Sequence, residues 1–467
     1  MKDLTVVILA AGKGTRMKSA TPKLLFDAAG RPLGVWPVAT ALALRPARVV
    51  VVVGGGRDAL AEAIRARFPK TPLAFAVQQE QLGTGHALRC ALPSLPRGTK
   101  RVLVLCGDAP LVTPEPLRRI VARARRRALG LLTSVVGDAA MYGRIVRDAR
   151  GRVVRIVEHR DASAGEREIR EVNPAVYVFD AAFLRRALRR LQRANVQREF
   201  YLTDLVAMAA RTPRGVADVV VPFDDLRGVN NRRELAAAED ALLARIRERW
   251  MVAGVTIRAP ESVRIEADVL LARDVELGPV AQLLGRTTVA AGARIGAGCV
   301  LRDVAVGPRA VLLPYVVATD STIARGARIG PFAHLRPKSV IGAGAQVGNF
   351  VETKNTVLLE GAKANHLAYL GDGDIGRRTN VGAGTIFCNY DGFGKWRTVL
   401  GDDVFIGSDS QLVAPVTVGD GAYIGSGSTI TEDVPPGALA VARGRQLVKR
   451  GYAKKLRERL QARKRRR

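Results

Sequence analysis

From Val311 to Val347 the chain reads VLLPYVVATDSTIARGARIGPFAHLRPKSVIGAGAQV, and an aliphatic side chain recurs at every sixth residue of this stretch. The repeat occupies Val311, Val317, Ile323, Ile329, Leu335, Ile341 and Val347, and it returns at Leu400, Ile406, Leu412, Val418, Ile424 and Ile430. A period of six fits neither a helix, which repeats every 3.6 residues, nor a flat strand, which alternates. It fits a coil of three short strands joined by tight turns, so the sequence predicts a parallel β-helix.

Glycine follows many of the repeat residues, at Gly330, Gly342, Gly348, Gly376, Gly382, Gly401, Gly407, Gly419 and Gly425. Small residues at these places are expected to let the chain bend at the corners of each coil. Because each coil is covered only by its neighbours, many coils must stack, and residues 255–430 have room for roughly ten coils. The alternative, a β-sandwich with chance spacing, is disfavoured.

The composition is that of a folded protein with more than one domain, since 467 residues with 48% hydrophobic side chains can build two cores or more. The apolar run Leu4–Ala11 resembles a signal segment, but cations follow it at once and nothing later reaches transmembrane length. The cysteines, Cys90, Cys106, Cys299 and Cys388, lie far apart without zinc-site spacing. We therefore expect a cytoplasmic protein with reduced thiols and no membrane insertion.

A formal net charge of +31 would attract polyanions such as nucleotides, nucleic acid or an anionic membrane. Arginine runs such as 125–127 and 185–186 nevertheless stand beside alanine-rich stretches, as expected of solvated helix faces. Aromatic residues make up only 5% of the chain, so we expect no specific nucleic-acid binding. The basic helical stretch Lys454–Arg467 could lie on phosphate-bearing ligands, on a membrane or in water.

The first apolar run, Val6–Ala10, leads into the glycine-rich loop 12–17 and then into Pro22-Lys23, a combination suited to binding phosphate. Gly12 and Gly14 let backbone N–H groups approach an anion, while Arg16 and Lys23 neutralise phosphoryl oxygens. The spacing matches neither a Walker loop nor the dinucleotide fingerprint.

The same order of strand and loop returns at 49–56 and 102–108, with a helical stretch at 57–67 between. This alternation predicts an α/β domain with a mostly parallel sheet, whose ligands lie beyond the carboxyl ends of the strands. Asp108 stands at such an end, where its carboxylate could bind Mg²⁺ or could be an ordinary helix cap before Pro110.

Ordered motifs in both halves of the chain resemble the bifunctional N-acetylglucosamine-1-phosphate uridyltransferase/glucosamine-1-phosphate acetyltransferase family, from about Leu4 to Arg443. The matching segments are 9–17, 81–87, 142–145, 157–161 and 228–232 in the first half, and 330–337, 348–352, 369–372, 380–385, 388–392 and 411–416 in the second.

The resemblance implies a Rossmann-like α/β nucleotidyltransferase domain at 1–229 and a left-handed parallel β-helix of hexapeptide repeats at 251–442. A helical linker at 230–250 lies between them, and a basic segment at 443–467 follows. Within the linker, Leu235, Leu242, Ile246 and Trp250 share one face of the expected helix 231–250.

In the first site the resemblance implies uridyl transfer from UTP to N-acetylglucosamine 1-phosphate. Arg16 and Lys23 would be catalytic, and Asp108 and Asn230 would bind Mg²⁺, a hard cation that prefers oxygen ligands. The implied nucleotide- and sugar-binding residues are Leu9, Ala10, Ala11, Gly12, Lys23, Gln78, Gly83, Thr84, Gly143, Glu158, Asn173 and Asn230. Two departures from the family pattern, Pro174-Ala175 for Thr-Gly and Cys106 for tyrosine, leave the sugar specificity less certain than the nucleotide chemistry.

In the second site the resemblance implies acetyl transfer from acetyl-CoA to the amine of glucosamine 1-phosphate. An ammonium group cannot attack a thioester, so a base is required, and His366 is expected in that role with Asn389 supporting it. The implied sugar-phosphate ligands are Arg336, Lys354, Tyr369 and Asn380. The implied acetyl-CoA ligands are Ala383, Asn389, Tyr390, Ser408, Ser426 and Arg443.

The resemblance also implies a homotrimer, because a single prism offers no deep cleft, and a supply of UDP-N-acetylglucosamine for the bacterial envelope. Two other functions stay open on the sequence. One is a single-activity sugar-1-phosphate nucleotidyltransferase whose β-helix only regulates or oligomerises. The other is a non-catalytic trimeric scaffold.

Overall fold

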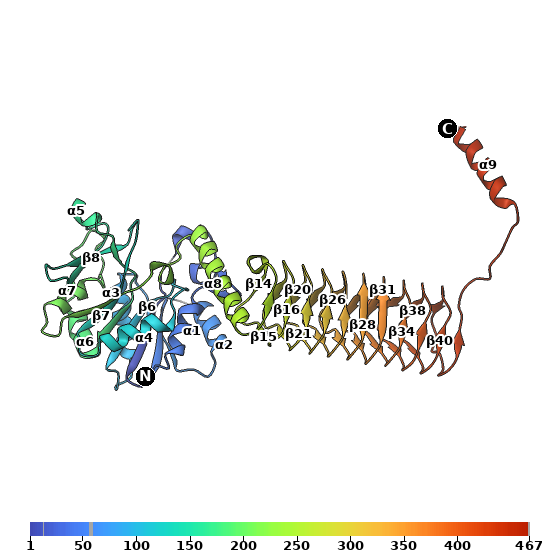
Figure 1. Cartoon of the computed structure of the whole chain (residues 1–467), viewed down its shortest axis with the longest axis horizontal. Coiled ribbons are helices and arrows are strands. Elements are labelled where there is room, and N and C mark those ends of the chain that lie inside the picture. Colours follow the sequence, from blue (N-terminus) through green and yellow to red (C-terminus); the bar gives the residue numbers. More distant parts are fainter. Residues whose placement is uncertain (13, 56–58, 466–467) are drawn as a thin grey trace. The chain divides into compact units, whose positions relative to one another are not determined.

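The computed structural model describes residues 1–12, 14–55 and 59–465 and contains two compact units, Met1–Ile246 and Arg247–Arg467 (Figure 1). The division falls inside helix α8 (Arg232–Val252). Lys13 of the glycine-rich loop, Gly56, Arg57 and Asp58 of the second loop and helix, and Arg466 and Arg467 lie outside the described residues.

The first unit is built on a mixed ten-stranded sheet in the order β5-β4-β1-β6-β11-β7-β10-β8-β9, with β12 beside β7. The parallel part consists of β5 (Leu73–Gln78), β4 (Arg48–Gly54), β1 (Leu4–Leu9) and β6 (Arg101–Cys106). The other strands are β7 (Leu129–Val135), β8 (Gly143–Arg147), β9 (Val153–Val157), β10 (Glu171–Asn173), β11 (Tyr177–Asp180) and β12 (Val216–Val220). The strands predicted from the apolar runs are confirmed, and their carboxyl ends share one edge of the sheet.

Helices cover this sheet and bury its aliphatic strands, including the fully buried Val6, Val7 and Ile8 of β1. They are α1 (Val35–Ala43), α2 (Ala59–Arg67), α3 (Thr84–Ala91), α4 (Pro114–Arg123), α5 (Ala164–Arg167), α6 (Ala181–Arg189) and α7 (Asp204–Ala210). The short ribbon of β2 (Asp27–Ala28) and β3 (Arg31–Pro32) completes the unit.

Helix α8 buries Leu242 and Ile246, as its apolar periodicity predicts, whereas Leu235 and Trp250 are half-buried. Arg245 fixes its position within the first unit, because its guanidinium donates to the Leu111 carbonyl at 2.6 Å and to Asp225 at 2.5 Å. In the part of the chain that the structure describes, no helix combines the length and the apolar character needed to cross a membrane.

The second unit is the predicted parallel β-helix, in which strands β13 (Thr256–Ile257) to β42 (Leu439–Ala440) form three parallel sheets of eleven, ten and nine strands. A strand typically pairs with the strand three places further along, so that β25 (Arg328–Ile329) pairs with β28 (Gln346–Asn349). The inward side chains stack one above another, as Ile329 does on Val347. After the β-helix, α9 (Tyr452–Arg465) forms the predicted C-terminal helix.

The six-residue repeat is correct from Ile323 onward, but it is wrong at Val311 and Val317. Val317 is 39% exposed, and the inward positions are Leu312 and Ala318. The turn between Ala318 and Ile323 spaces the inward residues by five instead of six, so the register shifts by one residue. Cα pairing gives 17 residues from Ala318 to Leu335 and 18 from Leu335 to Thr353, so both coil lengths occur.

The glycines after the repeat are required by close contact between coils. A Cβ added at Gly348 would lie 1.9 Å from the Asn365 carbonyl oxygen, and one at Gly376 would lie 2.1 Å from that of Gly401. Neither of these glycines has a positive φ. The expected role in bending is therefore replaced here by a steric one, since the next coil leaves no room for a side chain.

Gly376→Ala should destabilise the β-helix, because its methyl group must displace the backbone of the next coil. Overpacking of this kind costs about 2 kcal/mol or more, which corresponds to a fall of roughly 4–8 °C in the melting temperature of a unit this size. Gly444→Ala is the control, since an added Cβ there meets nothing within 4 Å. Calorimetry of both variants checks the expectation, and equal melting temperatures would contradict it.

Candidate active sites

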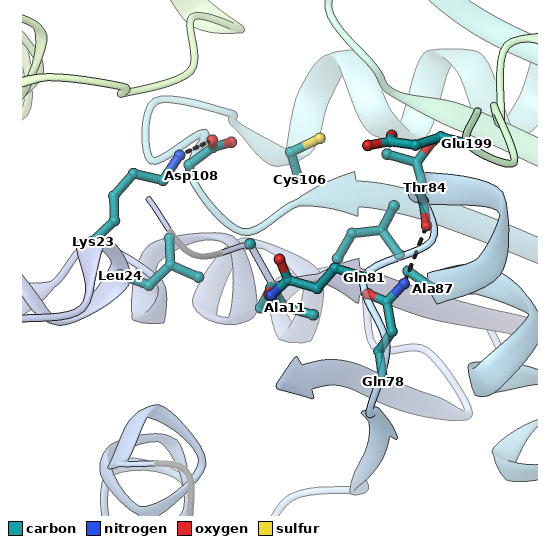
Figure 2. A pocket seen from close by; sticks show the side chains of 14 residues that line it. Ala11, Lys23, Leu24, Gln78, Gln81, Thr84, Ala87, Cys106, Asp108 and Glu199 are labelled. Atoms are coloured by element: carbon teal, nitrogen blue, oxygen red, sulfur yellow. Dashed lines mark hydrogen bonds and ion pairs between the residues drawn. The ribbon is translucent and has the colours of Figure 1, made fainter. Parts of the chain in front are cut away.

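A pocket of about 290 Å³ lies at the carboxyl edge of the parallel strands in the first unit. The predicted nucleotide-binding residues gather in it, as Figure 2 shows for several of them. Its lining includes Leu9, Ala10, Ala11, Gly12, Lys23, Gln78, Gly83, Thr84, Cys106 and Asp108. It also includes Gln81 and Glu199, which the sequence analysis did not single out.

One end of this pocket presents amide and backbone groups from the end of β5 and the start of α3. The Gln78 amide donates to the Gly83 carbonyl at 3.2 Å, and its nitrogen lies 3.1 Å from Nδ1 of His86. Gly83 has a φ of +103°, and a Cβ there would lie 2.8 Å from the Phe200 carbonyl oxygen, so only glycine fits. Gln81 donates to the Ala11 carbonyl at 2.5 Å and ties the two pocket loops together.

The opposite end of the pocket is charged, because Lys23 and Asp108 line it, and a second cation–oxygen pair, Arg16 with Asn230, lies outside its lining. The Lys23 ammonium lies 2.5 Å from Oδ2 of Asp108, and the Arg16 guanidinium donates to Oδ1 of Asn230 at 2.8 Å. The position of Asp108 before Pro110 left open that it caps a helix. It does not, because α4 starts later and has Thr113 at its N-cap. The two cations predicted to bind phosphate are thus held by the two residues predicted to bind metal.

Asp108 and Asn230 offer Mg²⁺ one carboxylate and one amide oxygen. Among the described residues, no cluster of three or more His, Cys, Asp or Glu side chains could hold a metal ion. A two-oxygen site nevertheless suits Mg²⁺, which completes its octahedron with water and substrate phosphates. Both oxygens already accept bonds from cations, so they lie where positive charge is stabilised.

A second pocket of about 210 Å³ adjoins the first and shares Cys106 and Asp108 with it. The predicted sugar ligands Gly143, Glu158, Asn173 and Asn230 line this pocket. Burial raises the pKa of the Glu158 carboxyl and nearby acids raise it further, whereas a hydrogen bond from Thr203 at 3.1 Å opposes the shift. A hydroxyl donor therefore already supports the Glu158 carboxylate at one oxygen.

The two departures from the family pattern both fall in this second pocket. Ala175 adopts a φ of +60°, and its N–H donates to Oδ1 of Asn173 at 3.0 Å. The amide of Asn173 in turn donates to the Tyr177 hydroxyl at 2.6 Å, so Asn173 is fixed by its own chain. Burial, reinforced by the charge of Asp108 and opposed by Lys23, raises the pKa of the Cys106 thiol to about 12, so this group stays neutral.

On the β-helix, His366 ends β31 (Lys363–His366) and is exposed. Its Nδ1 lies 3.0 Å from Oδ1 of Asn349, the residue that pairs with it on the preceding coil. Backbone bonds continue this corner through the next coils, from Gly384 to Leu367 at 3.0 Å and from Asp409 to Ala383 at 2.7 Å. The predicted acetyl-CoA residues Ala383, Ser408, Ser426 and Arg443 extend this row, and Arg443 donates to the Ser426 carbonyl at 2.6 Å.

A different corner of the same coils carries the predicted phosphate ligands. Arg336 follows β26 (His334–Leu335), and Lys354 ends β29 (Glu352–Lys354). The pKa of Lys354 is lowered, first by the adjacent Lys395, whose ammonium group favours the neutral amine of Lys354 as a hydrogen-bond acceptor, and then by the charges of Lys395 and Arg336. Three basic side chains therefore meet at one corner, an arrangement suited to a phosphate group, and one of them, Arg336, is held there by Glu352 at 2.7 Å.

Tyr369 and Asn380 begin strands β32 (Tyr369–Gly371) and β34 (Asn380–Val381) and are half-buried. Tyr390 lies on the exposed loop after β35 (Ile386–Cys388) and donates from its hydroxyl to the Gly392 carbonyl at 2.7 Å.

The expectation that Asn389 supports His366 does not hold within one chain. Asn389 is buried and donates to Oδ2 of Asp372 at 2.6 Å, and Asn349 takes the place beside the histidine. The reason is geometric, because His366 ends a strand of one sheet and Asn389 follows a strand of the next sheet. Asn349 could have been found from the sequence, since it stands 17 residues, or one coil, before His366. Lys395, the neighbour of Lys354, does not stand one coil away from it and could not have been found in this way.

Comparisons with known proteins agree with both halves of this description. The family model of MobA-like NTP transferase domains matches residues 6–208, and that of bacterial transferase hexapeptides (six repeats) matches 397–432. The "Bifunctional protein GlmU" of Sorangium cellulosum is 53% identical over 98% of this chain and 97% of its own length. Proteins of the same name from Anaeromyxobacter sp. (strain Fw109-5) and Aromatoleum aromaticum are 50% and 48% identical, over 96% and 95% of this chain and 92% and 97% of theirs. The hexapeptide match supports the predicted left-handed form of the β-helix.

Proposed function

Because the chain belongs to the family of bifunctional GlmU proteins, we propose that it makes UDP-N-acetylglucosamine in the cytoplasm by two successive transfers. The β-helix transfers acetyl from acetyl-CoA to glucosamine 1-phosphate. The first unit then joins UTP to N-acetylglucosamine 1-phosphate and releases pyrophosphate. The observation that carries this proposal is the presence of two unlike sites on one chain. One is a charged nucleotide pocket, and the other is a β-helix with an exposed histidine on one corner and a group of basic side chains on another.

In the uridyl transfer, the sugar phosphate is itself the nucleophile and is already ionised, so the site needs no general base. It must bring two anions together, which requires charge neutralisation and alignment. Arg16 and Lys23 supply the charge, and their pairing with Asn230 and Asp108 holds the two cationic groups in place before substrate arrives. When bound, Mg²⁺ would supply further charge neutralisation, with Asp108 and Asn230 as its protein ligands.

The two reactants are held in the two adjoining pockets. Gln78, Gly83 and Thr84 face the uracil, whose imide edge needs an amide and backbone groups. Gly143, Glu158 and Asn173 hold the amino sugar on the other side of Asp108. The reacting phosphates then meet where the pockets join, beside Lys23 and Asp108.

In the acetyl transfer, His366 removes a proton from the ammonium group of glucosamine 1-phosphate, so that the free amine attacks the thioester carbonyl. The new amide forms as the C–S bond breaks, and CoA leaves as a thiol with the proton that the nitrogen gives up. An oxygen acceptor at Nδ1 favours the tautomer whose Nε2 is free to accept that proton. Arg336, Lys354 and Lys395 bind the sugar phosphate, Tyr369 and Asn380 bind the sugar, and the row from Ala383 to Arg443, with Tyr390, binds acetyl-CoA.

We further propose that the enzyme is a homotrimer whose acetyltransferase sites are shared between chains. Support comes from the separation of the predicted ligands onto two corners of one coil, with the base at one corner and the phosphate-binding cations at another. A neighbouring chain would complete the site if its cationic corner lay beside the His366 corner of the first chain. In a closed threefold ring, each chain completes the site of the next, so that all three sites are complete.

Asp108→Ala should abolish most pyrophosphate formation through loss of a metal ligand, and Lys23→Ala should slow it roughly a hundredfold or more. Acetyl transfer should survive both changes, because the β-helix uses neither residue. Pyrophosphate release and thiol release, followed separately on one preparation, check this. Near-normal pyrophosphate release by Asp108→Ala would place the metal elsewhere.

His366→Ala should slow acetyl transfer by about 10²–10⁴-fold, the usual contribution of a general base. Melting temperature and uridyl transfer should be unchanged, because the side chain is exposed and buries little apolar area. Acetyl transfer that persists within a few fold, or a melting temperature several degrees lower, would instead indicate a structural histidine.

Mixed trimers test the shared site. Neither His366→Ala nor Lys354→Ala alone should support normal acetyl transfer, but co-expression in equal amounts should restore about a quarter of wild-type activity. Each site takes its His366 corner from one chain and its Lys354 corner from another. With random assembly each corner is intact in half of the sites, so both corners are intact in a quarter of them. Mixtures that stay as inactive as the single variants would show that each site belongs to one chain.

A further inference from the structure

The segment that follows the β-helix, residues 445–465 and here called the basic tail, is not used by either proposed site. It contains ten lysines and arginines and a single acid, Glu458. Within the described part of the chain, no ion pair involves a side chain of this segment. Its positive charge is therefore not neutralised by the protein itself.

The basic tail is also unpacked. Helix α9 has no buried residue, and Leu447 and Val448 before it are 78% and 68% exposed. An isolated helix of 14 residues is marginal in water, because few hydrogen bonds offset the cost of nucleation. Such a helix gains stability only when one of its faces is covered.

One face of α9 has the apolar character that such covering requires. Tyr452, Leu456 and Leu460 recur at intervals of four residues and so form one stripe along the helix. Tyr452 and Leu460 are 44% and 53% exposed. With 100° between successive residues, Lys455 and Arg459 flank one side of the stripe, and Arg457 and Lys464 flank the other. Arg463 lies on the same face and ends the stripe one turn after Leu460.

A narrow apolar stripe between two rows of cations is the pattern of a helix that lies in the plane of a membrane surface. The stripe enters the boundary between headgroups and acyl chains, and the cations pair with anionic headgroups. Nucleic acid would also attract the cations, but the stripe would gain nothing from it, and Tyr452 is the only aromatic side chain of the segment.

We propose that the basic tail docks this enzyme on bilayers that contain anionic phospholipid, with the stripe Tyr452, Leu456 and Leu460 facing the lipid. The chain lies on the surface and does not cross it. This inference does not depend on either transfer reaction, since the tail lies outside the residues proposed for them.

Sedimentation of the full chain with vesicles tests this inference. Vesicles of 30% phosphatidylglycerol and 70% phosphatidylcholine in about 0.15 M salt should bind the protein, and pure phosphatidylcholine vesicles should not. The stripe variant Tyr452→Gln/Leu456→Gln/Leu460→Gln keeps every charge but should bind about tenfold more weakly or less. Leu456→Phe/Leu460→Phe should retain binding, because the stripe stays apolar.

A matched pair of charge variants separates the basic tail from the overall charge. Lys454→Gln/Lys455→Gln/Arg457→Gln/Arg459→Gln should also lose about tenfold or more in vesicle binding. The control Arg185→Gln/Arg186→Gln/Arg189→Gln/Arg190→Gln removes the same charge from exposed positions in and beside α6 and should bind as wild type does. Uridyl transfer, measured on every variant, confirms that the first unit is folded.

Three results would overturn the proposal. Equal losses in the two charge variants would mean that only the net charge of the protein attracts the vesicles. Unchanged binding by the stripe variant would mean that no apolar face enters the bilayer. Binding of a single-stranded 20-nucleotide RNA that survives about 0.15 M salt, with no binding to the anionic vesicles, would make the tail a nucleic-acid segment instead.

Discussion

Parallel pairing of each coil with the next is the interaction on which the second half of this protein depends. Stacked strands place equivalent residues, in most coils 17 or 18 positions apart, directly over one another, and the glycines bring the backbones into contact. A functional side chain at one corner of a coil is therefore followed, at the same corner of the next coil, by the residue that stacks on it. In this way a linear sequence produces rows of ligands, such as the row from His366 to Arg443, without a cleft in the single chain.

The first half positions its chemistry by a different rule. Parallel strands end at a common edge, and loops from distant parts of the sequence meet there. Lys23 and Asp108 lie 85 residues apart, and Arg16 and Asn230 lie 214 apart, yet both pairs are in hydrogen-bond contact. The oxygens hold the cations in place until a phosphate offers a better partner, so the site is organised before substrate binds.

The basic residues behind the net charge of +31 fall into three groups according to their location. Some arginines are structural, such as Arg147, which bonds to Glu171 and Asp218, and Arg245, which holds α8. A few stand at the proposed phosphate sites. The basic tail differs from both groups, because its cations have no ion-pair partner among the described residues and lie beside an apolar stripe that no other element covers.

The sequence alone was sufficient for the β-helix and the α/β half, because both depend on local periodicity. The resemblance of its motifs to a known family supplied most residues of the pocket around Asp108, but not Gln81 or Glu199. The sequence did not give the register through the six-residue repeat, since the shift between Ala318 and Ile323 arises from a turn that is one residue shorter. It also could not decide side-chain partners: Asn349 rather than Asn389 beside His366, or Lys395 beside Lys354. Those choices depend on which corner of a coil each residue occupies, and only the summed lengths of all intervening turns, expressed in the tertiary structure, determine that.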